Sequence, residues 1–100
     1  MGLPVLITPA SVEDREWAAA LMAGTDPWIT LGRGLEACQR VCRVLEDPLA
    51  VARDGSLRLG FVLYRPRGFA GSPYIASLAV EASARGQGVG QALIAYVTSK

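Results

Sequence analysis

Histidine is absent from this chain of 100 residues, and cysteine and lysine are scarce. The two cysteines, Cys38 and Cys42, lie four positions apart on an expected helix, a spacing that is poor for a disulfide between them. A zinc site needs further thiolate or imidazole ligands, and only carboxylates are left to supply them. We therefore expect no metal site, and we interpret both cysteines as small core residues. A P-loop, which binds phosphate through a glycine-rich loop followed by lysine, is also excluded, because the single lysine is Lys100 at the end of the chain.

Long apolar runs and a strong net charge are also missing. No stretch approaches the ~20 apolar residues of a membrane span, and residues 1–10 lack the basic start of a secretory signal. The formal net charge of +1 gives no reason to expect a nucleic-acid or membrane partner. The sequence therefore predicts a cytoplasmic protein. Core material is abundant, since 51% of the residues are hydrophobic, and the length supports one domain over residues 1–100.

The spacing of apolar residues predicts elements in the order β-α-α-β-β-β-α. Strands are expected at residues 5–8, 49–53, 57–64 and 75–80, and helices at residues 11–22, at 35–45 and from Gly88 or Val89 onward. Ser11 and Asp14 resemble a capping box at the start of the first helix, which should end at Gly24. Asp54-Gly55 indicates a hairpin turn between two of the strands.

The middle of the chain adds one strand pattern and one open question. Strict alternation over residues 57–64 predicts an apolar face that carries Leu59 and a mixed face that carries Arg58. Trp28, in the loop at residues 25–32, either covers the core between two helices or lines a groove. Burying an indole contributes a large favourable free energy, so we favour the position of Trp28 over the core.

Residues 74–98 form the most informative stretch, a strand, a glycine-rich turn and a helix in direct succession. The turn places Gly86, Gly88 and Gly90 at alternate positions, which removes side chains from a short run of backbone. Because the turn lies at a helix N-terminus, its amides and the helix dipole favour a phosphate. The dinucleotide-binding fingerprint does not fit, since its third glycine would fall at Gln91. A tight turn without a ligand is the alternative interpretation.

The pattern Arg85-x-x-Gly88-x-Gly90, directly after a strand, resembles motif A of the GNAT acetyltransferase superfamily, Gln/Arg-x-x-Gly-x-Gly/Ala. The resemblance extends to Ile75-x-x-Leu78-x-Val80 in the strand and to Ala92-Leu93 in the helix. It implies an α/β (α+β) fold with a mixed, mostly antiparallel sheet flanked by helices. In the superfamily a further strand, a helix and closing strands follow this helix. The resemblance therefore implies that the C-terminal strands are missing, in a domain that is either cut or naturally shortened.

The same resemblance implies acetyl-CoA as acyl donor and a primary amine as acceptor, which the sequence does not identify. The amides of the turn would hold the pyrophosphate, and Arg85 would add charge at its edge. The exposed strand backbone would pair with the amides of pantetheine. The cofactor contacts implied in this way are Leu78, Ala79, Val80, Arg85, Gly86, Gln87, Gly88, Val89, Gly90 and Gln91.

No catalytic residue is assigned from the sequence. The superfamily's frequent base is a carboxylate on the central strand, where this chain has Ser77, and Glu81 follows the strand in an expected solvated position. The usual acid, a tyrosine, lies in the superfamily beyond the point where this chain ends, and Tyr64 and Tyr74 are interpreted as packing residues. Two functions stay open, an N-acetyltransferase and a non-catalytic CoA-binding or regulatory module.

A last expectation concerns assembly. With no strand after the final helix, the strand at residues 74–80 would keep one unpaired edge. That edge would lie beside an uncovered apolar helix face at Leu93, Ile94 and Val97. Open strand edges and exposed apolar patches attract other chains. The sequence therefore predicts a homodimer or a domain-swapped oligomer.

Overall fold

The computed structural model describes residues 5–25, 29, 32, 34–44, 48–65 and 73–99. Its elements follow the expected order β-α-α-β-β-β-α, with a short 3-10 helix added before the last helix. The strands are β1 (Leu6–Pro9), β2 (Leu49–Asp54), β3 (Leu57–Arg65) and β4 (Tyr74–Val80), and the helices are α1 (Val12–Ala23), α2 (Leu35–Cys42), η2 (Ala82–Ala84) and α3 (Val89–Thr98). The α/β class predicted from the sequence is confirmed.

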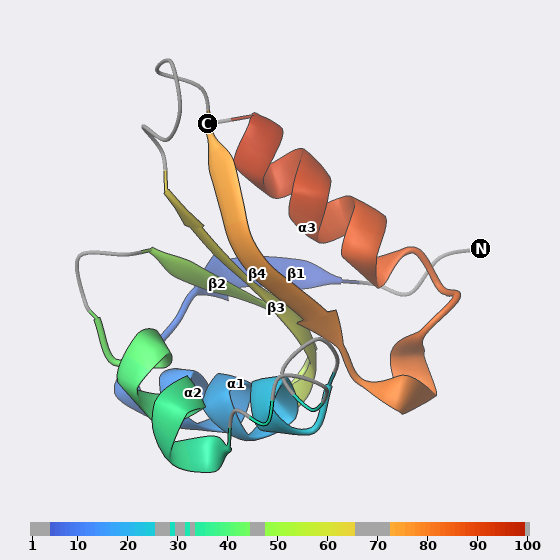
Figure 1. The fold of residues 1–100 in the computed structure, drawn as a ribbon. Coiled ribbons are helices and arrows are strands. Elements are labelled where there is room, and N and C mark those ends of the chain that lie inside the picture. The colour runs from blue at the N-terminus through green and yellow to red at the C-terminus, as the bar shows by residue number, and fades with distance from the viewer. Residues whose placement is uncertain are drawn as a thin grey trace.

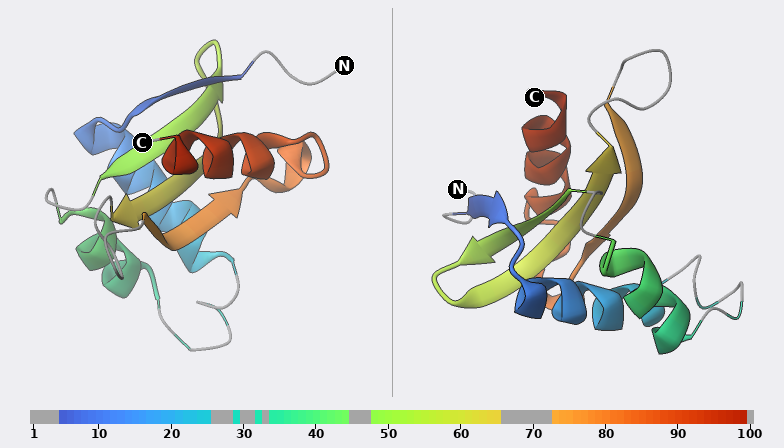
Figure 2. Two further views of the ribbon diagram at one scale, coloured as in Figure 1. Left: turned by 90° about the horizontal axis from the view of Figure 1, so that it is seen from above. Right: turned by 90° about the vertical axis from the view of Figure 1, so that its left-hand side faces the viewer.

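The described strands form one sheet in the order β1-β2-β3-β4, and each neighbouring pair is antiparallel. Helices α1 and α2 cover one face of this sheet, and α3 covers the other (Figure 1). Figure 2 shows the same three layers from two further directions, with α1 packed against α2. The glycine turn and α3 therefore lie on the opposite side of the sheet from α1 and α2.

Each face of the sheet has its own apolar core. The core beneath α1 and α2 contains Ala18, Ala19, Met22, Cys38, Cys42, Leu49, Val51, Phe61, Leu63 and Ala79. The core beneath α3 contains Ala50, Ala52, Leu59, Val62, Tyr64, Ala84, Val89, Leu93 and Val97. The uncovered helix face predicted for α3 is therefore wrong, because Leu93 and Val97 are 0% and 1% exposed, and of that group Ile94 alone is exposed, at 45%.

A β-bulge in β3 places Arg58 and Leu59 on the faces opposite to those predicted. Ala52 pairs with Gly60 and Arg53 pairs with Arg58, so Leu59 is an extra residue in β3. As a result Leu59 packs into the core beneath α3, and Arg58 turns toward α1. The prediction from alternation was wrong because a bulge depends on how two strands pair, which the sequence of one strand does not show.

The helix starts were predicted better than the helix ends. The amide of Asp14 donates to Ser11 Oγ at 3.1 Å and the amide of Ser11 donates to Asp14 Oδ2 at 2.9 Å, which confirms the capping box. Helix α1 has Gly24 as its C-cap, as predicted. Helix α2 ends at Cys42, earlier than predicted, and Leu35 on its expected apolar face is 47% exposed. Apolar spacing indicates that a helix exists but marks its ends poorly. Leu45, Trp28 and residues 66–72 lie outside the described residues.

Both cysteines are fully buried, which confirms their core role, and no disulfide joins them. Burial raises the pKa of the Cys42 thiol to about 11, and the neighbouring Cys38 adds to the shift. Within the described ranges, no group of three or more potential ligands could hold a metal ion. In those same ranges no helix has the length and apolar character needed to cross a membrane.

Candidate functional site

The glycine turn connects β4 to α3 by way of η2. Gly86 and Gly88 have φ angles of 78° and 84°, in the left-handed region that favours glycine. Gly88 is the N-cap of α3, and nothing lies within 4 Å of the position that a Cβ on either glycine would take. The backbone conformation therefore requires glycine at both positions, and the space beside them is open.

The start of α3 leaves backbone donors without partners inside the helix. The first amide that bonds back along the chain is that of Ala92, which donates to the carbonyl oxygen of Gly88 at 3.0 Å. The amides of Val89, Gly90 and Gln91 therefore have no acceptor within α3. Together with the positive end of the helix dipole, they favour an anionic group at this position.

A cavity of about 380 Å³ opens at this helix start. It is lined by Val80, Ala84, Arg85, Gly86, Gly88, Val89, Gly90 and Gln91. Arg85 Nε donates to the carbonyl oxygen of Val80 at 3.2 Å, which ties the arginine to the end of β4 and holds its charge beside the cavity. The cavity thus combines backbone donors, one cation and a run of small residues.

Most, but not all, of the predicted cofactor contacts line this cavity. Ala79 packs into the core beneath α1 and α2. Leu78 lies under the helix start, with its Cδ2 3.9 Å from the position of a Cβ on Gly90. Gln87 points elsewhere, since its Nε2 donates to the carbonyl oxygen of Ser83 at 3.4 Å. Ala84 was not predicted, because a small apolar residue carries no chemical signal in a sequence.

Strand β4 is the edge of the sheet among the described strands. A register shift interrupts its pairing with β3, since Leu63 faces Ser77 whereas Tyr64 faces Ile75. Ala76 is consequently an extra residue, and β4 bends at that point. The strand predicted to meet pantetheine therefore has a free side and a local irregularity within the described structure.

The tyrosines considered as substitutes for the missing acid have different environments. Tyr64 is 7% exposed, and its ring meets that of Tyr96 edge to face with centroids 6.3 Å apart, which confirms a packing role. Tyr74 is 52% exposed, so the packing role predicted for it was wrong. It is the first residue of the edge strand, where no described strand covers it.

Glu81 was expected to be solvated, but it is partly buried. Its amide donates to the carbonyl oxygen of Leu59 at 2.7 Å, which extends the pairing of β4 with β3 by one residue. Glu81 and Trp17 of α1 line two further cavities, of about 410 Å³ and about 280 Å³. No sequence pattern indicates this site, since the two residues are far apart in the chain.

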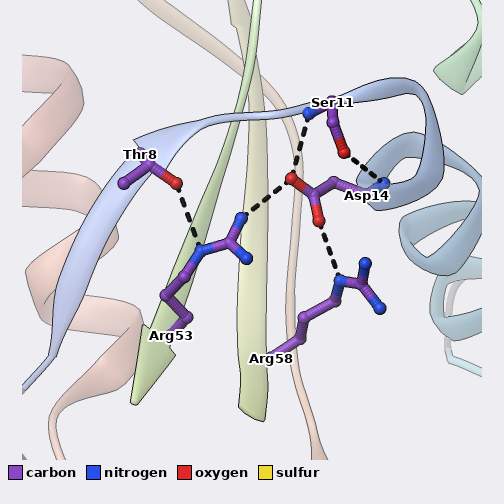
Figure 3. A network of polar contacts seen from close by, with 5 residues as sticks. All are labelled: Thr8, Ser11, Asp14, Arg53 and Arg58. Atoms are coloured by element: carbon purple, nitrogen blue, oxygen red, sulfur yellow. Dashed lines mark hydrogen bonds and ion pairs between the residues drawn. The ribbon is translucent and has the colours of Figure 1, made fainter. Parts of the chain in front are cut away.

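Asp14 is the centre of a polar network that includes Arg58, a lining residue of the larger of these two cavities (Figure 3). Its carboxylate accepts from Arg53 Nη2 and Arg58 Nε, each at 2.8 Å, and Arg53 Nε also donates to Thr8 Oγ1 at 3.2 Å. Burial on its own raises the pKa of Asp14, but the hydrogen bonds from the Ser11 amide, Arg58 and Arg53 outweigh it and lower the pKa to about 2. The carboxylate is therefore ionised throughout the neutral range.

The sequence profile of the acetyltransferase (GNAT) family matches residues 12–100. The solved structure of a ribosomal-protein-alanine N-acetyltransferase from Brucella melitensis biovar Abortus 2308 has a TM-score of 0.70 and 21% identity, covering 96% of this chain and 71% of that one. A transcriptional regulator from Bacillus halodurans C-125 has a TM-score of 0.68 and 19% identity, covering 95% and 72%. An aminoglycoside acetyltransferase from an uncultured soil metagenomic sample has a TM-score of 0.66 and 16% identity, covering 97% and 71%. Comparison with curated proteins found no match.

At these identities the solved structures show a shared fold and nothing finer. The family profile is more specific, because it spans most of the chain and includes the strand, the glycine turn and the helix at residues 74–98. The order of elements and the antiparallel sheet agree with the fold that the resemblance implied. The chain belongs to the GNAT acetyltransferase family.

Proposed function

We propose that this chain is an acetyl-CoA-dependent N-acetyltransferase of a primary amine, with residues 1–100 forming one acetyltransferase domain. The observation that carries the proposal is the cavity of about 380 Å³ at the start of α3. Its amides, its glycines and Arg85 suit a pyrophosphate. The outer edge of β4, unpaired among the described strands, supports backbone pairing of pantetheine with Leu78, Ala79 and Val80.

In the proposed reaction an acetyl group passes from the thioester of acetyl-CoA to the amine. The nitrogen of the neutral amine attacks the thioester carbonyl carbon, an N–C bond forms, and the C–S bond breaks with the electron pair going to sulfur. The thiolate takes up one proton, so an ammonium and acetyl-CoA yield an amide, CoA thiol and one released proton. Holding the donor in one orientation is the contribution that the turn and β4 support.

The first test replaces Gly88 with valine. The new side chain would occupy the open side of the turn and would disfavour the positive φ of 84° at this position. We expect acetyl-CoA to bind more weakly by about 2 kcal/mol or more, roughly 30-fold, because hydrogen bonds to a charged group are lost. Isothermal titration of acetyl-CoA into the variant and the parent measures this difference.

Gly55→Val is the matched control for Gly88→Val. Gly55 lies between β2 and β3 with a φ of 60°, nothing lies within 4 Å of a Cβ at this position, and it does not line the cavity. We expect this variant to bind acetyl-CoA like the parent. Melting curves without ligand show whether Gly88→Val is still folded, and the more conservative Arg85→Gln tests the site if it is not. Equal affinity of all these variants would contradict the pyrophosphate site.

The second test concerns pH. Strand β4 carries no carboxylate among its residues, Tyr74–Val80, so we propose that the acceptor amine loses its proton to solvent or through a water chain. The rate at low acceptor concentration should then rise with pH until the pKa of the free amine is passed. A pH profile of kcat/KM checks this expectation. If kcat/KM instead changes near neutral pH with the ionisation of a group of the enzyme, that group is a general base.

A non-catalytic CoA-binding or regulatory module is the second candidate function. The lack of a carboxylate on β4 favours it, and one protein of similar fold is described as a transcriptional regulator. This candidate predicts acetyl-CoA binding without release of CoA thiol for any amine. Thiol release measured over a panel of primary amines separates the two functions.

We also propose that the chain forms a homodimer or a domain-swapped oligomer through β4. The edge of β4 is unpaired in the described sheet, and Tyr74 and Ile94 are 52% and 45% exposed. Unpaired strand edges with nearby apolar side chains favour association. Light scattering coupled to size exclusion is expected to give at least twice the mass of one chain. A stable mass of one chain across micromolar concentrations would contradict the proposal.

We propose a cytoplasmic location for the protein. Cys38 and Cys42 are buried in the core without a disulfide between them, which supports a reducing compartment. Acetyl-CoA would be at hand there as the acyl donor.

A further inference from the structure

Two hollows lie beside Trp17 and share Trp17 and Glu81 as walls. The larger, of about 410 Å³, has polar walls that include Ser56, Arg58 and Ser83. The smaller, of about 280 Å³, has apolar walls that include Ala20 and Leu21. Because Trp17 and Glu81 line both hollows, the hollows adjoin, and a small ligand lying across these two residues can place a charged part in the first and an apolar part in the second.

Glu81 lines both hollows, and backbone hydrogen bonds hold it in place. The Glu81 amide donates to the carbonyl oxygen of Leu59 at 2.7 Å, and its own carbonyl oxygen accepts from the amide of Ala84 at 2.9 Å. Glu81 is the N-cap of η2 without a side-chain capping bond, and in the described ranges it takes part in no ion pair. Its oxygens can therefore accept from a ligand, and an ammonium with three donors is the matching group.

Arg58 supplies the opposite charge in the larger hollow. Its Nε donates to Asp14 at 2.8 Å, and Figure 3 shows its two terminal nitrogens beyond that contact. The side chain is 32% exposed, and its guanidinium lies 6.0 Å from the centre of the Trp17 ring. The contact with Asp14 and the indole hold the guanidinium in place, so its remaining donors can bind a carboxylate.

Trp17 lines both hollows and packs against the core. Its ring meets Phe61 edge to face with centroids 6.3 Å apart, and Phe61 is fully buried. A fixed indole, together with Ala20 and Leu21, makes a preformed apolar wall for the smaller hollow. An aliphatic side chain fits this surface better than a polar one does.

We propose that these hollows bind the acceptor, and that the acceptor is a small α-amino acid with an apolar side chain. Its ammonium pairs with Glu81, its carboxylate pairs with Arg58, and its side chain packs beside Trp17. The identification of this amino acid as the acceptor rests on the proposed acetyltransferase function. Acetylation removes the positive charge of the amine, so the product loses its pairing with Glu81 and binds more weakly than the substrate.

Titration calorimetry with three related probes tests the site on the whole chain. L-leucine is expected to bind, while N-acetyl-leucine, without the ammonium, and leucine methyl ester, without the carboxylate, bind roughly tenfold or more weakly. Equal binding of the three probes, or no binding of leucine, would overturn the inference. These comparisons use only the parent protein, so they hold even if a variant fails to fold.

The variant Glu81→Gln tests whether Glu81 is the residue that binds the ammonium of the ligand. We expect leucine to bind this variant roughly tenfold more weakly, with N-acetyl-leucine unaffected. Glu36→Gln removes one carboxylate from the exposed Glu36–Arg40 pair on α2 and should leave all three probes unchanged. The inference fails if Glu81→Gln keeps the parent's preference for leucine over N-acetyl-leucine.

A separate titration of acetyl-CoA distinguishes failure of this inference from failure of the proposed function. If acetyl-CoA binds and leucine does not, the acceptor site is wrong and the donor site stands. If leucine binds with the expected preferences and acetyl-CoA does not, the amino-acid site stands and the acetyltransferase proposal is contradicted.

Discussion

Replacing Asp14 with alanine is expected to lower the free energy of unfolding by about 3 kcal/mol. The Asp14 side chain is 5% exposed and accepts from Arg53 and Arg58 at 2.8 Å each. Its removal leaves two guanidinium groups close together without their common anion and deletes half of the capping box at Ser11. The arginines are 21% and 32% exposed, so solvent offsets part of the loss. Urea unfolding of the variant and the parent measures the change.

The control for Asp14→Ala removes an exposed carboxylate. Glu36 pairs with Arg40 at 3.7 Å, and both side chains are largely exposed, at 90% and 77%. Exposed pairs of this kind contribute little to stability, so Glu36→Ala should leave the unfolding midpoint nearly unchanged. If both variants lose a similar free energy of unfolding, the Asp14 network contributes no more to stability than an exposed ion pair does.

The same carboxylate makes stability depend on pH in acid. The pKa of Asp14 is about 2 in the folded chain, below the ordinary value of 3.8 that it takes in the unfolded chain, so the unfolded state binds the proton more readily. The stabilisation is complete above about pH 4 and is lost as the pH falls through about 2, a loss of about 2 kcal/mol. Asp14→Asn should lack this acid-dependent part. An equally steep decline in Asp14→Asn over that range would assign the effect to other groups.

The turn and its helix could be predicted from the sequence because their causes are local. Residues 74–98 contain the strand, the glycines and the apolar helix stripe in one continuous stretch. Positive φ angles at Gly86 and Gly88 and the start of α3 at Val89 follow from those residues alone. The cavity at the helix start is a consequence of the same segment, since residues 80–91 supply its whole lining.

The network and the second site depend on contacts between distant segments. Arg58 and Asp14 are 44 positions apart, and they meet because the bulge at Leu59 turns Arg58 toward α1. Glu81 and Trp17 likewise come together only when β4 and α1 are placed on the sheet. Alternation within one strand predicts neither contact, because each is decided by strand register and helix docking.

Gly60 is another residue whose role depends on a contact between distant segments, because it determines how closely β4 approaches β3. It lies on β3 and pairs with Val80, the last residue of β4. A Cβ on Gly60 would lie 2.8 Å from the carbonyl oxygen of Ala79 and 3.3 Å from Val80 Cα. Both are backbone atoms that no change of side-chain rotamer can move. Glycine at position 60 therefore lets β4 approach β3 closely at its last residues.

Gly60→Ala is accordingly expected to lower the free energy of unfolding by about 2 to 3 kcal/mol, because β4 must shift away from β3. Gly90→Ala introduces the same atom where it meets Val80 Cγ2 at 3.8 Å, so that variant should be as stable as the parent or more stable. Since the shift falls on Ala79 and Val80, Gly60→Ala should also weaken acetyl-CoA binding, although residue 60 does not line the cavity. Urea unfolding of both variants, and acetyl-CoA titration of Gly60→Ala beside the parent, test the two effects together. Parent-like stability of Gly60→Ala would mean that β4 is not held by this close approach.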